Sequence, residues 1–136
     1  MAVQATPAKV VDPSSPRAAQ VAIGAMSELG KLWEISTTQL LNLLGLSQTS
    51  FYRFKNGTSS SGLDLSTQER VSYLLRIQGA LEVLLPREQA DRWVSLPNTA
   101  PLFGGRSALE HMLGGQVGDL KEVADYLDSQ RGGDFL

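Results

Sequence analysis

Six side chains within one eight-residue stretch of this 136-residue chain combine amide, hydroxyl, phenol and basic groups. Amide and hydroxyl groups can form hydrogen bonds with base edges, while arginine and lysine bind phosphates. Such side chains reach the major groove of a duplex when one helix displays them on its outer face. The candidate DNA-contacting residues are Gln48, Thr49, Ser50, Tyr52, Arg53 and Lys55.

The residues around these side chains predict two short helices joined by a tight turn. Ser36 and Gln39 have the spacing of a capping box, which begins a helix. Gly45 follows at the point where a chain leaving a helix needs a positive φ. Phe51 and Phe54 lie three residues apart and give the second helix a buried face. The pattern predicts a helix-turn-helix, although an ordinary hairpin in a helical core would carry the same signals.

Apolar residues at helical spacing also occur along the rest of the chain, and no strand pattern is found. The sequence therefore predicts an all-α fold. A capping box of Ser66 and Glu69 is expected to begin one further helix. The further helices are expected over residues 17–33, 66–85, 87–95, 107–113 and 116–130. The first of them should bury one face, made up of Ala18, Val21, Ala22, Ala25, Leu29, Leu32 and Trp33.

Changes in composition divide the chain into three parts. Residues 1–16 carry three prolines among small and polar residues, which predicts a flexible N-terminal tail. Residues 17–85 are expected to form the helix-turn-helix domain and a dimer contact, because the helix over residues 66–85 has a broad apolar stripe. Residues 86–136 are expected to form a smaller C-terminal helical domain with an acidic end.

Several classes of function have little support in this composition. The absence of cysteine excludes disulfides and thiolate metal sites, and the single histidine, His111, cannot form a metal cluster alone. No catalytic triad or phosphate-binding loop is found, so neither an enzyme nor a cofactor is expected. No apolar run approaches the ~20 residues of a membrane span and no signal peptide is found, which predicts a cytoplasmic protein without membrane contacts. The net charge of −2 argues against coating of nucleic acid by electrostatics alone.

The run LGLSQTSFYRFKNG resembles the turn and recognition helix of phage-repressor and Xre-type regulators. In those proteins the first glutamine and the next hydroxyl residue read bases, a role that the resemblance gives to Gln48 and Thr49. Further along, LPREQADRW, the pair Pro97-Asn98, LFGGRSALEHML and a helix close to the chain end resemble the toxin-binding region of the Xre/MbcA/ParS antitoxins. The combined resemblance covers roughly residues 20 to 136. It departs at residues 104–107, where relatives often have a proline.

This resemblance implies a type II antitoxin. Such proteins inhibit a RES-domain toxin, which consumes or transfers NAD, by occluding its nucleotide cleft. They also repress their own operon by binding operator DNA, often as homodimers. A cleft for a dinucleotide pyrophosphate should be basic, and the acidic end of this chain would complement it. The residues expected to contact the toxin are Asp128, Arg131, Asp134, Phe135 and Leu136.

Two alternatives remain open at this point. Residues 132–136 have the composition of a frayed terminus, in which case they would contact nothing. The whole chain would also suit a stand-alone helix-turn-helix repressor whose C-terminal part only dimerises or senses a ligand. Deletion of the acidic tail separates the two functions, because a repressor should tolerate the deletion and an antitoxin should lose neutralisation.

Overall fold

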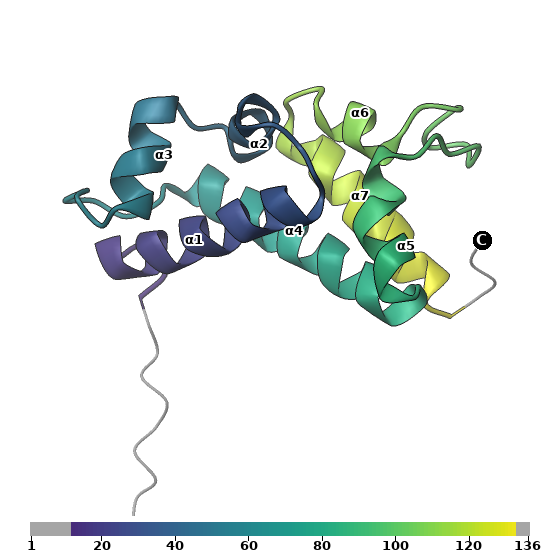
Figure 1. Ribbon diagram of the computed structural model, residues 1–136, viewed down its shortest axis with the longest axis horizontal. Helices are drawn as coiled ribbons and strands as arrows, with labels where there is room; N and C mark the ends of the chain where they lie inside the picture. Colours follow the sequence, from purple (N-terminus) through teal and green to yellow (C-terminus); the bar gives the residue numbers. More distant parts are fainter. Residues whose placement is uncertain (1–11, 133–136) are drawn as a thin grey trace, which may run out of the picture.

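The computed structural model describes residues 12–132 and consists of helices joined by short loops (Figure 1). Within this range no named strand occurs, and the antiparallel bridge between Pro97 and Ser107 is isolated. The predicted all-α fold is therefore confirmed. None of the helices in this range is long and apolar enough to cross a membrane. The elements are α1 (Pro16–Leu32), α2 (Thr37–Leu44), α3 (Gln48–Lys55), α4 (Leu65–Leu84), α5 (Arg87–Arg92), the 3-10 turn η1 (Trp93–Ser95), α6 (Ala108–Met112) and α7 (Val117–Gln130).

The long helix α4 is the central element of the fold. In Figure 1, α1, α2 and α3 form the left half of the molecule, with α2 near the middle, α5, α6 and α7 form the right half, and α4 extends across both groups. Its most extensive helix partner is α7, and it also packs against α2 and α5. The domain boundary expected after residue 85 stays a prediction, and the two parts share one hydrophobic core. Members of this core from successive elements are Ile23, Leu44, Leu74, Val94 and Leu120.

Polar side chains begin most of the helices by accepting hydrogen bonds from backbone N–H groups that have no partner inside the helix. The capping box of Ser36 is present as predicted. The start of α4 differs from the prediction, since Asp64 and not Ser66 caps this helix, with the Asp64 Oδ1 2.8 Å from the Thr67 N. The hydrogen bond from the Thr67 N–H favours the charged carboxylate and lowers the pKa of Asp64.

The buried face of α1 also differs from the predicted one. Val21 is 59% exposed, and Ala25 and Leu32 face solvent as well. The observed face is again spaced at three and four residues, but it buries larger side chains and so removes more apolar surface from water. The side chains that α1 and the residue after it place in the core are Ala19, Ile23, Met26, Leu29 and Trp33.

A buried arginine joins the two groups of helices. Arg70 of α4 is only 9% exposed, and its guanidinium donates hydrogen bonds to the carbonyl oxygens of Leu43 at 3.2 Å and Gly115 at 2.8 Å. Leu43 lies in the last turn of α2, and Gly115 lies in the turn before α7. A cation is favoured at the carbonyl end of a helix by the helix dipole. One side chain therefore stabilises two adjacent turns, one from each group of helices.

Gly45, in the turn between α2 and α3, is required partly because it lies against the Arg70 side chain. Gly45 has a φ of 66°, as the sequence predicted, and its N–H donates to the Asn42 carbonyl oxygen at 3.2 Å. A Cβ at this position would lie 3.2 Å from the Nε of Arg70. Any other residue would strain the backbone and press on the arginine, so glycine meets two requirements here.

A second buried polar contact joins α1, α4 and α5. The indole N–H of Trp33 donates to the Gln78 Oε1 at 2.7 Å, although both side chains are buried. The Gln78 Nε2 in turn donates to the Asp91 Oδ1 at 3.2 Å and to the Glu82 Oε1 at 3.3 Å. These hydrogen bonds offset the cost of burying polar groups, and they fix how the end of α1 meets α4.

We predict that Arg70→Ala lowers the free energy of unfolding by about 2–4 kcal/mol, because charged hydrogen bonds are lost and buried carbonyl groups are left without a donor. Urea denaturation followed by circular dichroism measures this loss. The control is Arg76→Ala on the same helix, whose ion pairs are exposed to solvent and should contribute about 1 kcal/mol or less. Equal losses for the two variants would contradict the central role of Arg70.

Candidate nucleic-acid interface and C-terminal site

The helices α2 and α3 form the compact two-helix unit that the sequence predicts. Ser47 caps α3, because its side-chain oxygen accepts a hydrogen bond from the Ser50 N–H at 3.1 Å. Phe51 and Phe54 are buried against the core, mainly beside α1. Since these two rings hold one face of α3, the opposite face is turned to solvent. This arrangement is what docking of a helix into a major groove requires.

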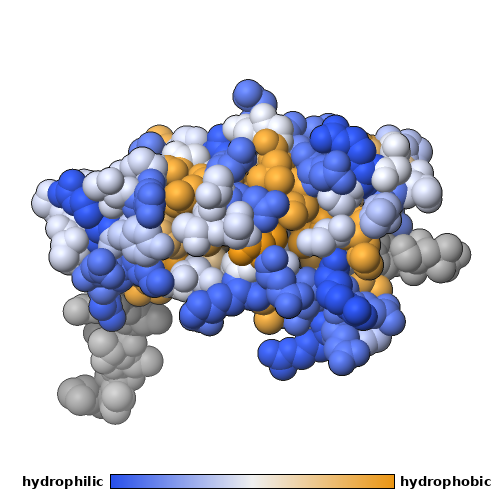
Figure 2. All heavy atoms as spheres, turned by 45° about the horizontal axis from the view of Figure 1, so that its top comes forward, coloured by the Kyte–Doolittle hydropathy of each residue, from blue (hydrophilic) through white to orange (hydrophobic). Residues whose placement is uncertain are grey.

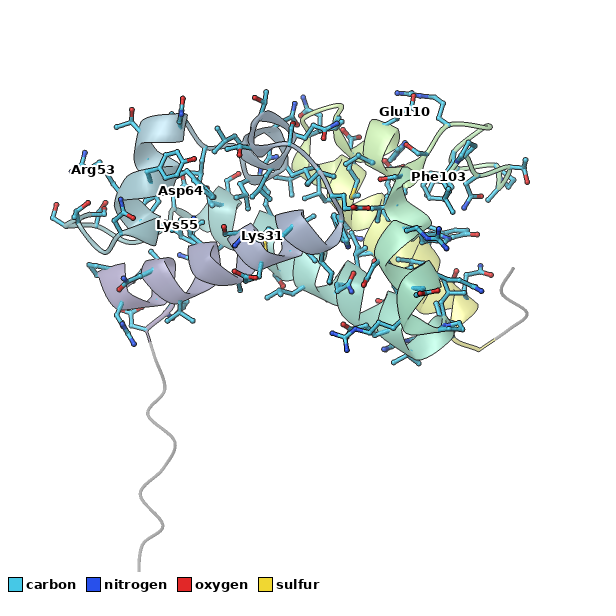
Figure 3. The ribbon with its side chains drawn as sticks, viewed as in Figure 1. Lys31, Arg53, Lys55, Asp64, Phe103 and Glu110 are labelled. Carbon is cyan, nitrogen blue, oxygen red and sulfur yellow. The ribbon has the colours of Figure 1, made fainter. Side chains whose placement is uncertain are left out.

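The structure places the six candidate DNA-contacting residues along the outer side of α3. Five of these side chains are exposed, while Ser50 is half-buried. Figure 3 shows Arg53 at the outer edge of α3, pointing away from the molecule, with Lys55 nearer to α1. The exposed members are Gln48, Thr49, Tyr52, Arg53 and Lys55. Their amide, hydroxyl and basic groups are therefore available to an external partner.

One aromatic side chain on this surface is already engaged. The Tyr52 ring meets the Phe51 ring edge to face, with the centroids 5.2 Å apart. The Lys55 Nζ lies 5.9 Å from the centroid of the Tyr52 ring. A cation–π contact at an exposed site contributes only about 0.5–1 kcal/mol. It therefore orients the Lys55 ammonium group without preventing it from binding a phosphate.

The loop after α3 contributes polar groups to the same surface. A hollow of about 90 Å³ brings Ser59 and Ser61 beside Ser50 and Arg53. The Ser59 Oγ donates to the Ser61 carbonyl oxygen at 2.9 Å, so the loop is held in shape by its own hydroxyl groups. Figure 2 shows that the end of the molecule around α3 is mainly hydrophilic, while apolar residues gather in a central band.

Two of the four acidic residues of α7, Asp125 and Asp128, are paired with lysine or arginine residues of the same chain. Asp128, expected to contact a toxin, forms a salt bridge with Arg76 of α4, and Asp125 forms others with Lys121 and with Arg76. The hydrogen bond from Lys121 lowers the pKa of Asp125. The hydrogen bond that Arg76 donates to Asp128 raises the pKa of the Arg76 guanidinium. Arg131 is exposed just after α7. Asp134, Phe135 and Leu136 lie outside the described residues.

One group of side chains on α6 and α7 has the donor set of a metal site. His111, Asp119 and Glu122 each offer a ligand atom, and these atoms lie within 4.8 Å of one another. The His111 Nε2 is already 3.2 Å from the Glu122 Oε1, and the Asp119 Oδ2 accepts a hydrogen bond from the Gln116 N–H at 3.1 Å. Each of these contacts also has a purely structural role, namely joining α6 to α7 and capping α7.

Comparison with known proteins identifies the family. Residues 80–133 match the family described as the antitoxin Xre/MbcA/ParS C-terminal toxin-binding domain. The chain is also 37% identical over 130 residues to an uncharacterised protein, y4oB, of Sinorhizobium fredii (strain NBRC 101917 / NGR234), and this alignment covers 93% of the present chain and 98% of that protein. The resemblance of the C-terminal region to the toxin-binding region of these antitoxins is thereby confirmed, and the chain belongs to the Xre/MbcA/ParS family of antitoxins.

Proposed function

We propose that this antitoxin inhibits a RES-domain, NAD-consuming toxin with its C-terminal end and binds operator DNA through α3 to repress its own operon. The observation that carries the proposal is the exposed polar face of α3 on the same core as a toxin-binding domain. The protein acts by binding and not by catalysis, and operator binding places its action in the cytoplasm.

The DNA-binding part of the proposal rests on the exposed end of α3. Gln48 and Thr49 lie in its first turn, where the recognition helix of a helix-turn-helix contacts base edges. Arg53 and Lys55 lie in the last turn, where they can bind phosphates on the flank. Such a small number of basic groups on a chain of net charge −2 gives a single copy little affinity for DNA.

Dimerisation would supply the affinity that one copy lacks. Two recognition helices then contact half-sites about one DNA turn apart. An apolar hollow of about 260 Å³ lies between α1 and α4, where Ala18, Ala22 and Val71 line it together with Leu75, which is 50% exposed. This surface supports a contact with a second copy, as the broad apolar stripe of α4 predicted.

The toxin-binding part of the proposal rests on the chain end. A cleft that binds the pyrophosphate of NAD is basic, so it favours the Asp134 carboxylate. Phe135 and Leu136 would add apolar contacts in the same cleft. We expect Asp128 to contribute less, because binding a toxin through this carboxylate would compete with its salt bridge to Arg76.

We predict that Gln48→Ala weakens binding to the operator by about 1–3 kcal/mol more than it weakens binding to random DNA, because a bidentate amide contact to a base is lost. Fluorescence anisotropy with both duplexes at one salt concentration measures this difference. An equal loss on both duplexes would remove Gln48 from the base-reading residues.

Arg53→Ala and Lys55→Ala should weaken binding to operator and random DNA alike, because phosphate contacts carry no sequence information. Each substitution should also reduce the slope of log K against log salt concentration by about 1. Titrations at several salt concentrations give this slope. Lys31→Ala is the control on α1, where Lys31 pairs with Glu28, and it should leave the slope unchanged.

Truncation after Gln130 should abolish neutralisation of the toxin while leaving the fold and operator binding intact, because the deleted residues lie beyond the last helix. Growth of cells that express the toxin, together with the circular dichroism spectrum of the truncated chain, checks both parts. Growth rescue equal to that by the full chain would show that the chain end does not occlude the toxin.

A further inference from the structure

A hollow on the C-terminal half is lined by four apolar and four polar residues, and two of the apolar ones, Leu96 and Pro97, are exposed. Its volume is about 360 Å³, and it lies where the end of α4, helix α5 and the segment after η1 meet. Leu96 at this hollow is 54% exposed, although burying a leucine side chain away from water is favourable in free energy. The apolar lining residues are Leu85, Trp93, Leu96 and Pro97, and the polar ones are Gln89, Arg92, Asn98 and Thr99.

The position of this hollow within the chain points to its occupant. All of its lining residues fall within residues 80–133, the segment that matches a toxin-binding domain. The outer side of α7 in the same segment is already engaged in ion pairs, including those from Asp125 and Asp128. Apolar surface left exposed in a partner-binding segment is typically covered by that partner.

The walls of the hollow are held in place before any partner arrives. The Trp93 ring stacks on Tyr126 of α7 at a centroid distance of 6.3 Å and meets Phe103 edge to face at 5.8 Å. After η1, the Asn98 N–H donates to the Arg106 carbonyl oxygen at 3.1 Å, which closes the following loop. A preformed site loses little conformational freedom on binding, so more of its contact energy appears as affinity.

Arg92 gives the hollow a specific polar group. Its side chain is exposed, and the one hydrogen bond that its guanidinium makes within residues 12–132 runs from Nε to the Glu88 carbonyl oxygen at 3.4 Å. Three acidic residues, Glu34, Glu88 and Asp91, line a separate hollow together with Arg92, but within residues 12–132 none of their carboxylates forms an ion pair with it. The fork of N–H groups can therefore receive a carboxylate from the partner.

We infer that this hollow is a second docking point for the toxin, which places an apolar side chain against Leu96 and a carboxylate against Arg92. This inference rests on the proposed function. The stack of Trp93 on Tyr126 sets the hollow beside the later turns of α7, from which the chain end leaves. One toxin can therefore contact the hollow and the chain end together, and two linked contacts raise the affinity above that of either alone.

The test measures, by calorimetry, binding of full-length variants to a purified RES-domain toxin that the wild-type chain inhibits. Leu96→Asp should weaken binding at least about tenfold, because an anchor residue in a desolvated pocket is replaced by a charge. The matched control is Val83→Asp, which replaces another aliphatic side chain, 69% exposed, outside the hollow. The control and the wild type should bind alike, and all three chains should keep the same melting temperature and operator affinity.

A second pair of variants tests the polar contact and does not alter the apolar surface. Arg92→Glu should weaken toxin binding at least about tenfold through repulsion of the toxin's carboxylate. The control is Arg87→Glu, which makes the same change of charge at an exposed position of the same helix and should leave toxin binding unchanged. If the wild type binds the toxin and both Leu96→Asp and Arg92→Glu bind equally well, the hollow is not a docking point, although the proposed function stands. If the wild type inhibits and binds no RES-domain toxin, the proposed function fails and this inference fails with it.

Discussion

The buried guanidinium of Arg70 is the contact on which the arrangement of the two ends depends. It lies against the glycine turn between α2 and α3 and donates to carbonyl oxygens of α2 and of the turn before α7. A charge inside a protein is stable only when its N–H groups are satisfied, so both turns must keep their positions around it. The position of α3 relative to the core and the start of α7 are therefore fixed by the same side chain.

This constraint explains how a chain of 136 residues can present two different surfaces. The domain is too small for two independent cores, and α4 gives one side to α2 and another to α5 and α7. The Trp33 and Gln78 contact adds a second fixed point between α1 and α4. With the shared core held in this way, the outer face of α3 and the hollow beside Leu96 lie outside the core and can vary in chemistry.

The parts of the fold that follow local rules could be read from the sequence. The capping box of Ser36, the positive φ of Gly45 and the buried face of α3 each depend on residues within a few positions, and all three were predicted correctly. The prediction of the buried face of α1 was partly wrong. Small apolar residues lie on several sides of this helix, and only packing against the other helices decides which of them are buried. The hydrogen bonds of Arg70 and the ion pair between Asp128 and Arg76 join residues that lie 27 to 52 positions apart in the sequence, so no local pattern reveals them. The hollow beside Leu96 could not be predicted from the sequence, because it forms only where the packed helices leave space between them.

We propose that this member of an antitoxin family silences an NAD-consuming enzyme by binding it. The most direct measurement follows the rate of NAD consumption by the purified RES-domain protein while the full-length chain is titrated in. The account predicts that the rate falls to background at a fixed stoichiometry and that added operator DNA does not restore it, since the two surfaces lie at opposite ends of one core. An unchanged rate in the presence of an excess of folded chain would contradict the account.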